Sequence, residues 1–194
     1  MDEREAWDIL YGKRPRAWRG IGDVPDLDLP EGCNVLDAGC GNGKTASSLI
    51  ELGFDVTGID FSPNAIESCS EVHGKKAEFI TGDCLDMPFP DGSFNGVYAV
   101  HLTEHFDDGD VRVFSSECFR ILEPGGKLFI RSFSPEDMRS ERAVREGIRY
   151  RYRKPENIVS LFDGFEVQES RLVNETTKFG TVRSRSECVF LKPL

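Results

Sequence analysis

Apolar runs alternate with amphipathic segments between residues 34 and 133. Residues 44–52 and 110–122 place apolar side chains three or four positions apart, the spacing of one helix face. Ser62 followed by Pro63 predicts a further helix start, because a hydroxyl caps the first turn and proline fits its first position. Between the helices, short apolar runs predict strands at residues 34–38, 54–59, 77–81, 94–100 and 127–133. This alternation predicts right-handed crossovers and a parallel sheet.

The pattern changes after Ser134. Residues 135–154 are charged and rich in arginine, and residues 155–162 predict a short helix. Residues 165–173 and 186–191 predict two more strands, which we expect to form an antiparallel edge. The polar stretch between those strands is too irregular for a prediction, and Pro124-Gly125-Gly126 predicts a turn. The fold class is therefore α/β: a doubly wound, mostly parallel, seven-stranded sheet with an antiparallel edge strand.

Composition narrows the class of protein. The 194 residues suit one domain, with 39% hydrophobic and 30% charged residues. No apolar stretch approaches the ~18 residues of a membrane span, and the acidic start lacks the features of a signal peptide. We therefore expect a cytoplasmic protein without a membrane partner. The six cysteines form no C-x-x-C pair, so neither a metal site nor a disulfide framework is predicted. The net charge of -10 disfavours nucleic acid as a partner.

The strand at residues 34–38 runs into a loop with glycines at positions 39, 41 and 43. This spacing fits neither a dinucleotide fingerprint nor a phosphate-binding P-loop, so it favours a nucleoside ligand over a pyrophosphate. Asp60 ends the second strand, where a carboxylate can accept hydrogen bonds from both hydroxyls of a ribose. Phe61 offers an apolar face to an adenine ring, and Asp83 offers an acceptor to its amino group.

Four successive motifs carry a family resemblance. VLDAGCGNG, VTGIDFSP, ITGDCLDMPFPDGSFNGVYAV and ILEPGGKLFI resemble, in this order across residues 33–133, the motifs of class I S-adenosylmethionine-dependent methyltransferases. They most resemble the type 11 and type 12 branches, which act on small molecules. The alternative is another nucleotide-binding fold whose glycines only permit packing. The resemblance implies S-adenosylmethionine as cofactor and a cofactor site built from Asp37, Gly39, Cys40, Gly41, Asp60, Phe61, Asp83, Cys84, Val100 and Trp18.

The resemblance also divides the single domain, residues 1–194, into three parts. Residues 1–30 form an N-terminal cap segment, residues 31–133 the cofactor-binding core, and residues 134–194 a lid segment with the C-terminal edge strands. The segment after the fourth strand faces the acceptor in this family, which makes His101 the first candidate for a general base and His105 the second. The alternative is that these histidines cap a loop or face solvent.

Basic residues gather in the cap and lid segments of this otherwise acidic chain. We expect them to form a positive mouth over the cofactor that selects an anionic acceptor, since guanidinium groups suit carboxylate and phosphate. The alternative is a solvated face paired with the 34 acidic residues. The predicted substrate contacts are Tyr11, Arg14, Arg19, Glu104, Arg149 and Arg151.

The function predicted from the sequence is in-line methyl transfer from S-adenosylmethionine to a small acceptor, either anionic or uncharged. One alternative is a methyltransferase acting on RNA or tRNA through the basic segments, which would bind RNA with a steep salt dependence. A protein that binds the cofactor without catalysis is another, and a protein methyltransferase is a further one.

Overall fold

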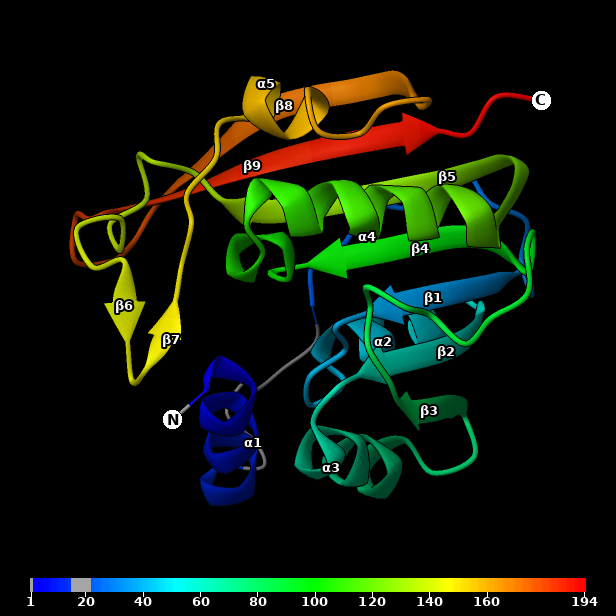
Figure 1. Cartoon of the computed structure of the whole chain (residues 1–194), viewed down its shortest axis with the longest axis horizontal. Helices are drawn as coiled ribbons and strands as arrows, with labels where there is room; N and C mark the ends of the chain where they lie inside the picture. The colour runs from blue at the N-terminus through cyan, green and yellow to red at the C-terminus, as the bar shows by residue number, and fades with distance from the viewer. Residues whose placement is uncertain (1, 15–21) are drawn as a thin grey trace.

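The computed structural model describes residues 2–14 and 22–194. Within these residues, one sheet has seven strands in the order β3-β2-β1-β4-β5-β9-β8 (Figure 1). All neighbours pair in parallel except β9, which runs antiparallel to β5 and β8. This confirms the predicted fold class. The strands are β1 (Asn34–Ala38), β2 (Asp55–Asp60), β3 (Ala77–Thr81), β4 (Phe94–Val100), β5 (Leu122–Phe133), β8 (Glu166–Thr176) and β9 (Val182–Leu191).

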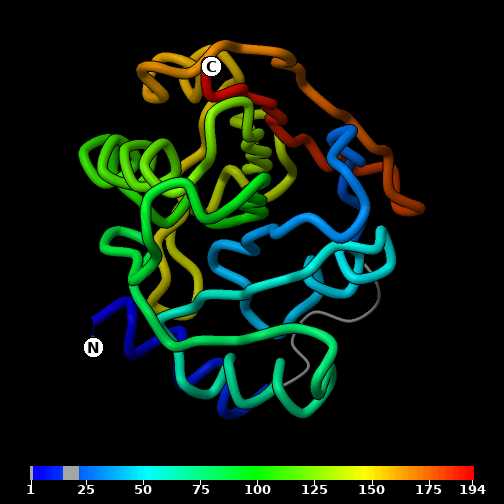
Figure 2. Tube along the Cα trace, turned by 90° about the vertical axis from the view of Figure 1, so that its right-hand side faces the viewer, coloured from blue at the N-terminus to red at the C-terminus, as the bar shows by residue number. Residues whose placement is uncertain are grey.

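Helices cover both faces of the sheet, with α2 on one side and α4 on the other (Figure 2). Successive side chains of a strand point to opposite faces. Val35 therefore packs in the apolar cluster that contains Leu49 of α2, whereas Leu36 packs in the cluster that contains Phe114 of α4. The helices are α1 (Glu3–Lys13), α2 (Lys44–Glu51), α3 (Pro63–His73), α4 (Asp108–Ile121), α5 (Pro155–Val159) and the 3-10 turn η1 (Thr103–His105).

Side-chain caps set the starts of α3 and α4. Ser62 Oγ accepts a hydrogen bond from Ala65 N at 3.1 Å, with proline in the first turn of α3, which confirms the predicted start. Asp107 accepts from Asp110 N at 2.9 Å, so α4 begins two residues before the predicted Asp110. No helix of the described residues is long and apolar enough to cross a membrane.

Two segments differ from the sequence prediction. Pro124-Gly125-Gly126, predicted as a turn, lies inside β5, where the register with β4 shifts between Phe94 and Gly96. The irregular stretch between the last two strands extends both of them into one long hairpin. Strand β8 is exposed along nearly its whole length and runs to Thr176, three residues beyond the predicted end at Val173.

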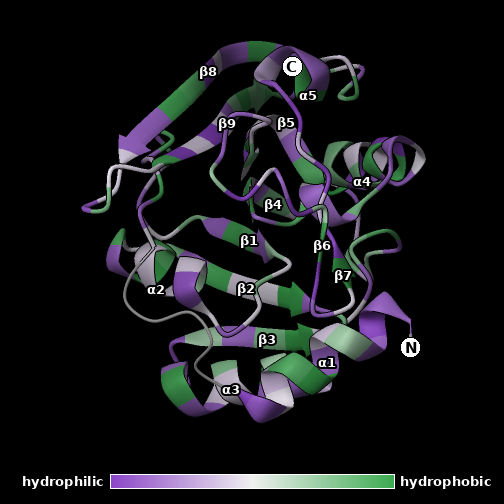
Figure 3. Ribbon diagram, turned by 90° about the vertical axis from the view of Figure 1, so that its left-hand side faces the viewer, coloured by the Kyte–Doolittle hydropathy of each residue, from purple (hydrophilic) through white to green (hydrophobic). Residues whose placement is uncertain are grey.

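The arginine-rich segment that sequence analysis assigned to a lid contains a small hairpin of its own. Strands β6 (Val144–Arg145) and β7 (Ile148–Arg149) pair antiparallel through Glu146 and Gly147, whose φ angles of 53° and 83° are both positive. Two positive φ angles are typical of the tightest hairpin turns. The α1 helix lies beside this hairpin and contacts β7 (Figure 3). These contacts connect the segment that sequence analysis assigned to the cap with the segment that it assigned to the lid.

Candidate functional site

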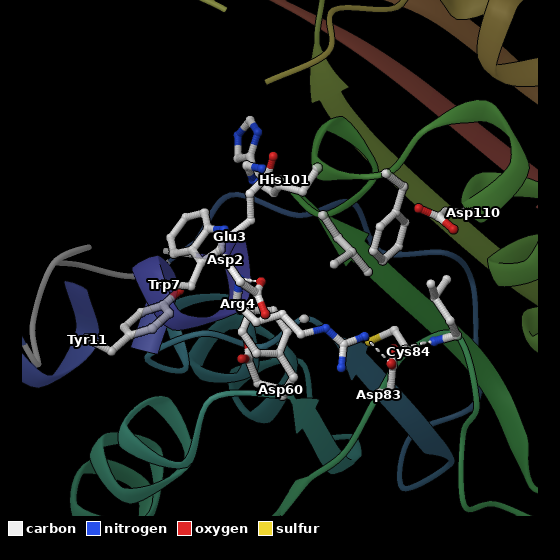
Figure 4. Close-up of a pocket in the computed structure, with 16 residues that line it drawn as sticks. Asp2, Glu3, Arg4, Trp7, Tyr11, Asp60, Asp83, Cys84, His101 and Asp110 are labelled. Carbon is white, nitrogen blue, oxygen red and sulfur yellow. Dashed lines mark hydrogen bonds and ion pairs between the residues drawn. The ribbon is translucent and has the colours of Figure 1, made fainter. Parts of the chain in front are cut away.

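Four parallel strands end at one pocket, and α1 supplies a further side of it (Figure 4). This is the edge of a doubly wound sheet where ligands bind. The lining draws on the segments that follow β1 to β4 and on the first helix: Asp2, Glu3, Arg4, Trp7, Tyr11, Gly39, Asp60, Phe61, Asp83, Cys84, Leu85, His101, Leu102, His105, Phe106 and Asp110.

The loop after β1 needs its glycines. Gly41 has φ 52°, and a Cβ atom there would lie 2.5 Å from Tyr11 Oη. At Gly39, with φ 68°, a Cβ atom would lie 2.8 Å from Leu102 Cδ1. The loop backbone therefore passes close to side chains of α1 and of the segment after β4, and only glycine fits these positions. The predicted residue Cys40 is buried between them and does not line the pocket.

Asp60 ties this loop to the end of β2. One carboxylate oxygen accepts from Gly41 N at 2.9 Å and the other from Ser62 N at 3.0 Å. Burial raises the pKa of Asp60, while these two backbone hydrogen bonds favour its ionised form. Each carboxylate oxygen has a second lone pair. Asp60, which lines the pocket, can therefore still accept hydrogen bonds from a ligand's hydroxyl groups.

Asp37, the penultimate residue of β1, has a carboxylate oxygen that a bound ligand could satisfy. It is buried, it accepts a hydrogen bond from the backbone of Ala46, and its Oδ2 atom has no hydrogen-bond partner among the residues that the structure describes. Burial raises the pKa of Asp37 to about 8. A buried acceptor without a partner is uncommon and marks a strained or functional position. An ammonium group, such as that of the amino-acid part of S-adenosylmethionine, fits this oxygen by charge and hydrogen bonding.

Phe61 and Asp83, which sequence analysis assigned to adenine, both line the pocket. The side chain of Arg4 occupies the space beside them: its guanidinium pairs with Asp83 Oδ2 and lies 5.6 Å from the centre of the Phe61 ring. Asp83 Oδ1 accepts from Leu85 N at 2.9 Å, which holds the carboxylate in place. Sequence analysis missed Arg4, because nothing in the local pattern signals a contact 79 residues away.

His101 follows β4 and forms a hydrogen-bonded pair with Glu104. The Nδ1 atom lies 2.9 Å from Glu104 Oε1, and Ser132 Oγ donates to Glu104 Oε2 at 3.1 Å. Burial alone would raise the pKa of Glu104, but the charge of His101 and its hydrogen bond outweigh burial and hold that pKa below its usual value. An ionised Glu104 accepts from Nδ1–H, which leaves Nε2 of the pocket-lining ring as the basic nitrogen.

The backbone fixes this ring firmly. His101 has φ 60°, a conformation uncommon for residues other than glycine and concentrated at functional sites. Its N–H donates to Arg131 O at 2.8 Å, and its ring stacks on Phe133 with 4.2 Å between centres. The buried guanidinium of Arg153 donates to Thr103 O at 2.8 Å and so holds the η1 turn that carries Glu104. Sequence analysis did not identify Ser132 or Arg153 as supports of this pair.

His105 has a different environment. Its ring packs edge-on against Trp7 at 5.0 Å and Tyr150 at 4.8 Å, and its Nδ1 lies 3.0 Å from Arg149 O. Burial, the largest effect, lowers the pKa of His105. The ring lines the pocket and connects α1, η1 and the lid segment. The geometry therefore favours His101 over His105 as a base, and a catalytic role for His105 stays a prediction.

The predicted positive mouth does not form among the described residues. Arg14 pairs with Glu146 at 3.5 Å, Arg149 pairs with Glu3 at 3.7 Å, and Arg151 donates to His105 O at 2.9 Å. These three arginines do not line the pocket, whose lining instead carries the carboxylates of Asp2, Glu3, Asp60, Asp83 and Asp110. Pairing with acidic residues, the alternative interpretation of the basic pattern, accounts for Arg14 and Arg149, and a backbone carbonyl accepts from Arg151.

Of the other predicted residues, Tyr11, Gly39 and Cys84 line the pocket, whereas Asp37, Gly41, Val100 and Glu104 do not. Trp18 and Arg19 lie outside the described residues. The roles assigned to all these residues from the sequence stay predictions.

Replacing Asp37 with asparagine is expected to stabilise the ligand-free protein and to weaken cofactor binding. The native state keeps Asp37 protonated up to a pKa of about 8, whereas the unfolded chain ionises it near its ordinary value of 3.8. The wild-type protein therefore loses stability as pH rises between these values, and the variant does not. Thermal melts should show a gain in melting temperature that is larger at pH 8 than at pH 5.

The exposed Asp55, at the opposite end of β2, is the matched control for this measurement, because Asp55→Asn removes the same charge away from the pocket. A variant Asp37→Asn that melts below the wild-type protein at pH 8 would contradict the assignment.

Comparison with known proteins agrees with the family resemblance found in the sequence. A family described as a methyltransferase domain matches residues 36–130. The chain is 38% identical over 114 residues to 2-methyl-6-phytyl-1,4-hydroquinone methyltransferase of Synechocystis sp., covering 57% of this chain and 35% of that protein. It is 36% identical over 106 residues to a sterol 24-C-methyltransferase of Gibberella zeae, covering 52% of this chain and 27% of that protein.

A solved SAM-dependent methyltransferase from Methanosarcina mazei superposes with a TM-score of 0.75 at 23% identity, covering 89% of this chain and 100% of that one. At this identity the likeness shows the fold. The chain spans about a third or less of the length of the two curated relatives. Residues 36–130, which the family matches, include the pocket-lining residues that follow β1 to β4.

Proposed function

Because the chain belongs to the class I S-adenosylmethionine-dependent methyltransferases, we propose that it transfers the methyl group of S-adenosylmethionine, its cofactor, to a small-molecule acceptor. The observation that carries this proposal is the His101–Glu104 pair, which lies beside a pocket whose other end suits an adenosyl group. The pair gives the acceptor side of the pocket a base, which a protein that only binds the cofactor does not need.

The residues present fit the cofactor along the ends of the first three strands. Asp37 would pair with the ammonium group, Asp60 would accept from the ribose hydroxyls, and Phe61 with Asp83 would hold adenine. Bound S-adenosylmethionine would supply an electrophilic methyl group on a positively charged sulfur. Displacement at that carbon depends on alignment, and well-oriented reactants gain about 7–11 kcal/mol from positioning.

His101 would act on the acceptor. As the acceptor atom bonds to the methyl carbon and the carbon–sulfur bond breaks, Nε2 of His101 would take the acceptor's proton. Glu104 would hold Nδ1–H and stabilise the resulting imidazolium. Ser132, which donates to the other Glu104 oxygen, keeps the carboxylate oriented. The products are the methylated acceptor and S-adenosylhomocysteine, and the proton leaves His101 to solvent.

The pocket favours an acceptor without negative charge. Asp2, Glu3 and Asp110 lie on its lining and Arg4 is its one described arginine, so an anion would meet repulsion. Trp7 and Tyr11 stack at 5.6 Å on the α1 side and offer apolar faces. The two relatives are named for a hydroquinone and a sterol, both compatible with an uncharged hydroxylated or carbon acceptor.

The test is formation of S-adenosylhomocysteine in the presence of paired acceptors. A hydroquinone and the same ring bearing a carboxylate form one pair, and unmodified tRNA serves as a separate substrate. Turnover with the uncharged member of the pair supports the proposal. Methylation of tRNA alone would support the RNA-acting alternative. Cofactor binding without product from any acceptor would leave a cofactor-binding protein.

A further inference from the structure

The α1 helix places a side chain where the cofactor's adenine is expected. The Arg4 guanidinium pairs with Asp83 Oδ2 and lies over the Phe61 ring, with its central carbon 5.6 Å from the ring centre (Figure 4). A guanidinium is planar, donates several hydrogen bonds and stacks on aromatic rings. An adenine ring with its amino group would use the same aromatic face and the same carboxylate.

We propose that Arg4 is an internal occupant of the adenine subsite, which the cofactor must displace in order to bind. The inference rests on the proposed function, which assigns Phe61 and Asp83 to adenine. Phe61 and Asp83 both line this pocket, so an adenine that stacks on the ring and bonds to the carboxylate would need the space that Arg4 occupies. Arg4 is then a residue that lowers cofactor affinity, although it lies within contact distance of the cofactor site.

The anchoring of α1 makes a local displacement feasible. Asp8, one turn further along the helix, accepts from Ser62 Oγ at 2.6 Å and from Asn64 Nδ2 at 2.9 Å, so α1 is fastened to the start of α3. The Arg4 side chain is 55% exposed and Asp83 is 32% exposed. Arg4 can therefore swing into solvent while the Asp8 contacts stay in place.

The expected size of the effect follows from the two contacts that Arg4 loses. An exposed ion pair together with a cation–π contact corresponds to a factor of about 3 to 30 in an equilibrium constant. Removing Arg4 should strengthen binding of adenosyl ligands by such a factor. A residue that helps to hold the bound cofactor would show the opposite sign.

Calorimetric titration with S-adenosylhomocysteine tests this directly, because the ligand carries adenine and cannot react. Arg4→Ala should bind about 3 to 30 times more tightly than the wild-type protein. Arg4→Lys should fall between them, since lysine keeps the charge but lacks the planar fork. Arg112→Ala is the matched control: Arg112 pairs with Asp163 on the α4 side, away from the pocket, and its removal should leave the affinity unchanged.

Equal or weaker binding by a folded Arg4→Ala protein would overturn the inference and leave the proposed function standing. Circular dichroism establishes folding, and Arg4→Lys gives the same comparison without a loss of charge. Absence of binding by the wild-type protein and by all variants would instead refute the proposed function, so the two failures are distinguishable.

Discussion

Replacing His101 with alanine is expected to lower kcat by about 100- to 10,000-fold, the range that a positioned general base contributes. Binding of S-adenosylhomocysteine should change little, because the proposed function assigns Asp37, Asp60 and Asp83 to the cofactor and His101 to the acceptor. Steady-state kinetics with the best acceptor, beside calorimetry with S-adenosylhomocysteine, separates the two effects. Added imidazole should restore part of the lost turnover.

Glu104→Gln tests the same base through its partner. The buried amide can donate to Nδ1 of His101, which moves the ring proton to Nε2 and removes the base. We expect a lower kcat with an almost unchanged KM and a changed pH dependence of kcat. A decrease in kcat of less than tenfold in His101→Ala would contradict the assignment of His101 as the base and would favour catalysis by positioning alone.

Replacing Asp60 with alanine is expected to raise the Kd of S-adenosylhomocysteine by at least about 100-fold. Hydrogen bonds to a charged group contribute about 1.5–3 kcal/mol each, and the ribose would lose two of them. The variant also leaves Gly41 N and Ser62 N without their acceptor, so the glycine loop loses its tie to β2. Calorimetry measures the change.

Asp55→Ala is the matched control, because Asp55 begins the same strand at the end far from the pocket. Its Kd should equal that of the wild-type protein. An Asp60→Ala protein that is folded and binds within threefold of wild type would show that Asp60 serves the loop and does not contact the cofactor.

Much of the fold between β1 and β5 was predictable because most of its elements carry a local signal. Ser62 with Pro63 marks a helix start, and three glycines within five residues mark the loop after β1. The ends of the strands then place Asp60 and Asp83 at one edge, since parallel strands end together. These parts follow from spacing along the chain, and the structure places them as expected.

The remainder of the site depends on contacts between distant segments. Arg4 reaches Asp83 across 79 residues, and Ser132 reaches Glu104 across 28. His101 and Glu104 were both candidates, but their pairing depends on a left-handed backbone and a 3-10 turn that no local pattern predicts. The arginines of the lid misled the sequence interpretation because their acidic partners lie in other segments, as with Arg149 and Glu3.

The buried Asp37 carboxyl makes cofactor binding a proton-releasing process. Below its pKa of about 8 the ligand-free protein holds a proton on Asp37, and pairing with an ammonium group requires the ionised form. Each ligand bound near neutral pH then expels one proton, so affinity should rise with pH until about 8. Calorimetry in buffers with different heats of ionisation should give apparent binding enthalpies that differ by that one proton, and identical enthalpies would show that Asp37 is already ionised before the cofactor arrives.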